Sequence, residues 1–174
     1  MQQFLTRWQP WLSTAVRLFL AGVFAVAGWP KLIHSEDTVR SVRGFQILPE
    51  SLVPTFAYVL PVVELAVALL LVVGLFTRIS ALVYAAMMAM FLGGIASAWV
   101  RGLPIDCGCF GSAGTLVTDP VPGFIKDTLR DTGLLLLALG VARWPRGVLD
   151  ADRLLGLVPA PSQVDAASQA DAAR

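Results

Sequence analysis

The hydrophobic pattern of the chain consists of four long apolar stretches separated by shorter polar segments. The stretches cover about residues 11–29, 52–75, 79–100 and 124–144. Each is close to the ~20 residues that an α-helix needs to cross the hydrocarbon core of a bilayer. Backbone polar groups in lipid must be satisfied within the segment, and the alternation typical of a membrane β-barrel is absent. The pattern therefore predicts an all-α, integral membrane four-helix bundle with short loops.

The segments between these stretches complete the predicted organisation. Residues 75–78 leave almost no loop between the second and third helices, which indicates an antiparallel hairpin. Residues 30–51 form a longer loop, in which Ser35 and the acidic residues after it resemble the start of a helix. The apolar residues of that short helix are expected to lie on the membrane surface: Val39, Val42 and Phe45.

The predicted transmembrane domain covers residues 1–146. Residues 147–158 are interpreted as a short interfacial helix, and residues 159–174, rich in Ala, Ser, Gln and Asp, as a disordered tail. Near the N-terminus, Arg7 and the apolar run after it imitate a cleaved secretory signal. The interfacial Trp8 and Trp11, and Arg17 within the run, favour a retained helix instead.

Composition narrows the class of protein. Hydrophobic residues make up 56% of the chain and charged residues 14%, whereas soluble globular chains carry roughly 25% charged residues. The net charge of +1 offers no basic field for phosphates. These values exclude a soluble enzyme, a disordered chain and a nucleic-acid binder, and they leave the lipid bilayer as the expected surroundings.

Both cysteines of the chain lie in one short segment before the fourth stretch. The segment reads Asp106, Cys107, Gly108, Cys109, Phe110 and Gly111. Two cysteines separated by one residue reach the ~4.4–6.8 Å Cα spacing of a disulfide only in a bent chain, and Gly108 supplies the freedom to bend. So small a ring is strained and easily reduced, which suits thiol–disulfide exchange better than structural cross-linking.

Two other interpretations of this segment stay open on spacing alone. The cysteines could be inert loop thiols, or they could join His34 and Asp106 as ligands of a zinc ion. Basic residues divide evenly between the two predicted membrane faces, so charge does not decide the orientation. We expect a multi-pass inner-membrane protein with both termini in the cytoplasm, because exchange is more useful in an oxidising compartment.

A second candidate site is the carboxylate of Glu64 within the second stretch. A charge at that depth costs ~2.5–3.5 kcal/mol on insertion scales and should face the bundle interior with a partner. Arg17 and Tyr84 are expected at a similar depth, which predicts an Arg17–Glu64–Tyr84 polar clasp. The alternative interpretation of Glu64 is a proton or quinone site.

Several motifs resemble those of known membrane proteins. Arg17, the run at 28–32 and the run at 74–78 resemble DoxX-type membrane proteins, and the run at 107–111 resembles the MauE branch. The resemblance implies a membrane bundle that helps to mature a disulfide-rich redox enzyme, beside a separate thioredoxin-like partner outside the cytoplasm. For DoxX relatives it also implies a link to membrane quinones.

The sequence thus predicts a redox-associated membrane protein that acts through Cys107 and Cys109, with a membrane quinone as a candidate electron donor or acceptor. Two rival hypotheses are a non-catalytic scaffold for redox enzymes and a quinone or small-solute site centred on Glu64. The scaffold should keep its activity without the two cysteines, whereas the Glu64 site should depend more on Glu64 than on the thiols.

The predicted orientation can be tested with fusions to alkaline phosphatase, which is active only outside the cytoplasm. A fusion after Gly114 should be active and a fusion after Arg78 inactive. The reverse pattern would mean that the chain is inserted the other way round.

Overall fold

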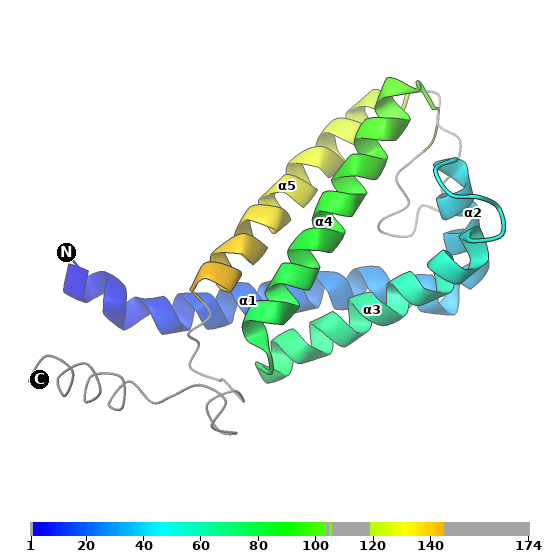
Figure 1. Ribbon diagram of the computed structural model, residues 1–174. Helices are drawn as coiled ribbons and strands as arrows, with labels where there is room; N and C mark the ends of the chain where they lie inside the picture. The colour runs from blue at the N-terminus through cyan, green and yellow to red at the C-terminus, as the bar shows by residue number, and fades with distance from the viewer. Residues whose placement is uncertain (1, 104, 106–118, 145–174) are drawn as a thin grey trace, which may run out of the picture.

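The computed structural model describes residues 2–103, 105 and 119–144, with side chains from residue 11 onward. These residues form five α-helices: α1 (Gln2–Ile33), α2 (Ser35–Gly44), α3 (Val53–Val73), α4 (Thr77–Val100) and α5 (Val121–Arg143) (Figure 1). The all-α prediction is confirmed for this part of the chain. The predicted interfacial helix at 147–158 and the tail at 159–174 lie outside the described residues.

Three helices are long and apolar enough to cross a membrane. Their candidate spans are Trp11–Ile33, Val53–Val73 and Thr77–Val100. Many large apolar side chains on these spans point outward, as expected when the surroundings are lipid; among them are Phe19, Val26, Val62, Leu69, Ile79 and Leu82. Helix α5 has the length of a span but carries charges in its first half, so the fourth crossing stays a prediction.

The four long helices form two pairs. Helix α1 packs along α3, and α4 packs along α5. The pairs meet near the turn between α3 and α4 and separate toward α2 (Figure 1). Gly74 and Phe76 both adopt left-handed backbone conformations, with φ of 74° and 49°, which makes the α3–α4 turn tight. The predicted hairpin is therefore present as a turn, but each of its helices packs mainly on another neighbour.

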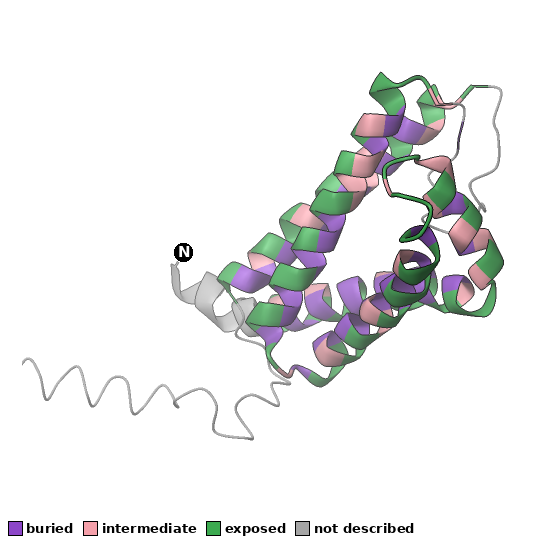
Figure 2. Cartoon of the chain, turned by 45° about the vertical axis from the view of Figure 1, so that its right-hand side comes forward, coloured by how far each residue is buried: buried purple, intermediate pink, exposed green. Residues whose placement is uncertain are grey.

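The main core lies where the two pairs meet. Figure 2 shows buried residues on the facing sides of the helices. Phe24 of α1 stacks on Tyr84 of α4, with ring centroids 3.7 Å apart. Leu20, Leu71 and Ala138 are completely buried around this stack. Contacts from all four long helices thus close this end of the bundle.

Helix α2 lies at the end where the pairs separate. Its acidic first turn is present as predicted, but its polar residues Thr38 and Ser41 are buried. The Thr38 hydroxyl donates a hydrogen bond of 3.2 Å to the carbonyl of Lys31, and so ties α2 back to α1. Val42 and Phe45 face a cavity in the bundle, so their predicted place on the membrane surface is wrong. The helix instead covers a gap that the diverging pairs would leave open.

A glycine sets how closely α1 approaches α3. A Cβ atom added at Gly28 would lie 3.2 Å from Cβ and Oε2 of Glu64 and from Cγ of Leu65. Because Gly28→Leu forces these helices apart, we expect a loss of about 1–3 kcal/mol in the free energy of unfolding. The matched control is Gly22→Leu on the same helix, where a Cβ meets nothing within 4 Å. Thermal unfolding in detergent should separate the two variants, and equal stability would mean that the close approach is unimportant.

Candidate functional site

A buried ion pair joins α1 to α3 beside the cavity that Val42 and Phe45 face. Lys31 Nζ lies 2.6 Å from Glu64 Oε1, and the two side chains are 7% and 1% exposed. The same ammonium lies 5.3 Å from the centre of the Phe91 ring on α4. The close approach at Gly28, one turn before Lys31, lets the lysine reach the carboxylate. One cation thus contacts groups on both helix pairs.

The partner of Glu64 differs from the predicted one. Arg17, Glu64 and Tyr84 are all buried in the bundle, but the ion pair of Glu64 is with Lys31 rather than Arg17. Glu64 lies against Gly28, and Arg17 precedes Gly28 by eleven residues, about 16 Å along a helix axis. Neither Glu64 Oε2 nor the Tyr84 hydroxyl has a hydrogen-bond partner among the described residues. The predicted Arg17–Glu64 pairing is therefore wrong.

Sequence reasoning missed Lys31 because the first helix was expected to end near residue 29. Helix α1 continues to Ile33, so Lys31 is helical and points inward. A signal was present in the spacing: Arg17, Phe24, Gly28 and Lys31 follow one another at intervals of seven, four and three residues. Such intervals place side chains on one face of a helix.

A second acidic group lies beside this pair. Asp131 of α5 is 2% exposed and lines a small internal space together with Lys31 and Glu64. Arg130 donates from Nε to Asp131 and from Nη1 to Asp127, both at 2.9 Å. Asp127 and Asp131 are thus buried and Arg130 is partly buried, whereas Lys126 on the same helix is exposed. Asp131 and Arg130 add further ionisable groups close to the Lys31–Glu64 pair.

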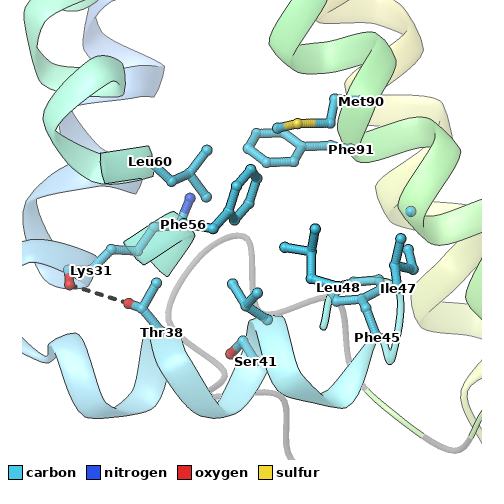
Figure 3. Close-up of a pocket in the computed structure, with 12 residues that line it drawn as sticks. Lys31, Thr38, Ser41, Phe45, Ile47, Leu48, Phe56, Leu60, Met90 and Phe91 are labelled. Atoms are coloured by element: carbon cyan, nitrogen blue, oxygen red, sulfur yellow. Dashed lines mark hydrogen bonds between the residues drawn. The ribbon is translucent and has the colours of Figure 1, made fainter. Parts of the chain in front are cut away.

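A larger cavity opens beside Lys31, between the two helix pairs. Its volume is about 200 Å³, and its lining is almost entirely apolar. Phe56 and Phe91 lie close together on one side of it and Phe45 lies across the space, and the Lys31 side chain extends toward Leu60 and Phe56 (Figure 3). Helices α1 to α4 and the turn after α2 all contribute residues to its wall. It is the part of the site with room for a ligand.

Polar contacts hold the turn that forms the outer rim of the cavity. Arg101, at the end of α4, donates to the carbonyls of Phe45 and Gln46. Arg43 binds the carboxylate of Glu50 across the turn. The hydrogen bond and charge of Arg43 lower the pKa of Glu50, and those of Glu50 raise the pKa of Arg43. The rim is therefore linked both to α2 and to α4.

The predicted thiol site lies outside the described residues. This holds for Asp106, Cys107, Gly108, Cys109, Phe110 and Gly111. The residue just before it, Ile105, is buried among Ile95, Ala98 and Phe124, and its Cγ2 lies 3.7 Å from where a Cβ of Gly44 would stand. Ile105 thus lies beside the end of α2. Of the predicted zinc ligands only His34 is described, and its Nδ1 lies 3.3 Å from the carbonyl oxygen of Pro30.

Comparison with known proteins identifies the family. The family model described as "Methylamine utilisation protein MauE" matches residues 9–144. The chain belongs to the MauE family. It is 39% identical over 135 residues to the methylamine utilization protein MauE of Paracoccus denitrificans and 36% identical over 141 residues to that of Methylorubrum extorquens. In both cases 77% of this chain and 70% of the relative are covered.

Family membership and the three apolar helices identify a membrane protein. The MauE resemblance that the motifs predicted is confirmed, while the broader relation to DoxX-type proteins stays a prediction. No solved structure gives a significant match. The matched region runs from α1 to the end of α5, so it contains the Lys31–Glu64 pair, the cavity and the thiol segment.

Substitution of the ion pair tests its importance for this MauE-family fold. Lys31→Met leaves a buried carboxylate without its partner, so we expect a loss of about 3–5 kcal/mol in stability. The Lys31→Met/Glu64→Met double variant should lose much less than the sum of the single variants. The measurement is a double-mutant cycle by thermal or denaturant unfolding in detergent. Arg43→Met is the matched control, because it removes an exposed cation and should have little effect.

Proposed function

We propose that this protein is a membrane accessory protein of methylamine utilisation whose Cys107–Cys109 pair exchanges disulfides with a thioredoxin-like protein outside the cytoplasm. The observation that carries the proposal is membership of the MauE family over residues 9–144, in a chain whose two cysteines are one residue apart. The names of the relatives refer to methylamine utilization. The spacing of the cysteines favours a reducible bond.

The chemistry of the exchange needs no further cofactor. A thiolate of the partner attacks one sulfur of the Cys107–Cys109 disulfide, which forms a mixed disulfide and releases the other cysteine as a thiolate. A second thiolate of the partner then attacks the mixed bond. The partner leaves oxidised, and this chain keeps two thiols. The reverse sequence reduces the partner, and the direction depends on the two reduction potentials.

The packing around the thiol segment supports a role at the α2 end of the bundle. The segment begins after the buried Ile105, and α5 begins at Val121, close to the buried Phe124. Ile105 and Phe124 belong to one small apolar cluster, joined by Phe45 at the end of α2. Both flanks are therefore held at this end of the bundle. We place this end on the extracytoplasmic side of the inner membrane, with both termini in the cytoplasm.

The exchange can be tested by trapping the mixed disulfide. When one thiol of this chain attacks a disulfide of the partner, this chain's other thiol resolves the mixed disulfide. Cys107→Ser or Cys109→Ser removes that resolving thiol, so each single variant should accumulate a covalent complex with an oxidised thioredoxin-like protein. The complex should appear on a non-reducing gel and disappear with dithiothreitol. The double serine variant is the control and should form none. Its failure to support growth on methylamine would link the thiols to the pathway.

The same experiment separates the rival functions. A scaffold that only recruits redox enzymes would keep its activity in the double serine variant. A carrier centred on Glu64 would lose more with Glu64→Gln than with loss of both thiols. Thiols that stay reduced in intact cells, measured with a membrane-impermeant alkylating reagent, would contradict the exchange.

A further inference from the structure

We propose that the cavity beside Lys31 binds the ring of a membrane-soluble quinone, with one ring oxygen accepting a hydrogen bond from Lys31 Nζ. The described residues that line the cavity belong to α1, α2, α3, α4 and the turn after α2. The proposal that this site accepts electrons from the thiols rests on the proposed function, whereas the proposal that it binds a quinone ring does not.

The walls of the cavity suit a flat apolar ring. Phe56 and Phe91 lie close together on one side, and Phe45 lies across the space (Figure 3). Aromatic rings pack favourably against other ring systems in stacked or edge-on arrangements. The volume of about 200 Å³ suits a single ring rather than a bulky ligand.

Exposed apolar side chains border one side of the cavity, and one of them belongs to the candidate membrane span Thr77–Val100. Ile47 and Met90 line it and are 54% and 41% exposed. Met90 precedes the end of α4 by ten residues, which is about 15 Å along the helix. An isoprenoid tail attached to the ring can therefore leave between exposed apolar side chains.

Lys31 supplies the polar end of the site. Its ammonium has three donors, of which Glu64 Oε1 takes one. Among the described lining residues, Thr38 and Ser41 carry hydroxyl groups, and both already donate to backbone carbonyls, Thr38 to that of Lys31 and Ser41 to that of Asp37. Lys31 is therefore the charged donor that this part of the lining offers to a ligand.

The charge balance favours a neutral ligand over an anion. Glu64 already neutralises Lys31, and Asp131 in the adjacent internal space is paired with Arg130. A fatty-acid carboxylate would bring an additional negative charge into this apolar region, which is costly. A quinone carbonyl accepts the hydrogen bond without bringing a charge.

A quinone bound at this site would be the electron acceptor for the Cys107 and Cys109 thiols. Oxidation of the Cys107 and Cys109 thiols to a disulfide releases two electrons and two protons. A quinone takes up two electrons and two protons to become a quinol, so the reaction balances without another reactant. Negative charge that develops on the quinone oxygen during reduction would be stabilised by Lys31.

The test uses the full chain in phosphatidylcholine nanodiscs. A photoreactive azidobenzoquinone should label residues of the cavity wall, and ubiquinone-1 should suppress the labelling. Gly94→Leu fills the cavity, because a Cβ at Gly94 stands 3.6 Å from the Phe45 ring, and it should reduce labelling at least tenfold. Gly93→Leu is the matched control, since a Cβ there meets nothing within 4 Å, and it should label as the unaltered chain does.

Removal of the donor and competition with an acid complete the test. Lys31→Met should weaken quinone binding about tenfold or more, as expected for loss of a charged donor. Dodecanoate should not compete with the probe. Equal labelling of the Gly94→Leu and Gly93→Leu variants would overturn the site, and competition by dodecanoate alone would overturn its assignment to quinones.

The double serine variant separates this proposal from the proposed function. Quinone binding should persist when Cys107 and Cys109 are both replaced, because the proposed contacts with the ring come from Lys31 and the phenylalanine side chains. If Gly94→Leu abolishes binding and also leaves the thiols reduced in cells, both proposals are supported. If it abolishes binding while the thiol redox state is unchanged, the quinone site stands and the transfer of electrons from the thiols fails.

Discussion

The buried contact between Lys31 and Glu64 governs how the rest of this bundle is built. Neither charge would be tolerated alone in an apolar interior, so the two helices that carry them must hold the groups together. This requires α1 to continue past the membrane-spanning run and its backbone to lie directly on α3, which the absence of a side chain at Gly28 allows. The contact of the ammonium with Phe91 extends the same constraint to α4.

The cavity follows from the way the helices diverge. Large side chains fill the bundle where the two pairs meet, around Phe24 and Tyr84. Toward α2 the pairs separate, and one short helix with its turn covers the space without filling it. Arg101 fastens that turn to α4, which keeps the cover in place. The bundle is thus densely packed where the two pairs meet and contains a covered cavity at the α2 end.

Apolar length and helix-start signals predicted the helices well, because lipid leaves the backbone few alternatives. The sequence could not show that α3 and α4 pack mainly on other helices, since a short turn constrains only their ends. It also could not pair Glu64 correctly. Whether Lys31 is a loop residue or an interior one depends on one extra helical turn, and the spacing of Lys31 from Gly28 and Phe24 was the signal in the sequence for that turn. Prediction of the cavity would have required the angle between the helix pairs, which depends on the packing of many side chains.

The open side of the cavity has a consequence for how tightly anything must bind there. Met90 and Ile47 border it, and Met90 lies well inside α4 rather than at its end. A ligand of the proposed site would therefore enter sideways from the hydrocarbon, where lipid-soluble molecules are concentrated by partition, and not from water. Occupancy would then be governed by the abundance of the ligand among the lipids. A site of this kind can stay largely filled with modest intrinsic affinity, and it can release its ligand quickly.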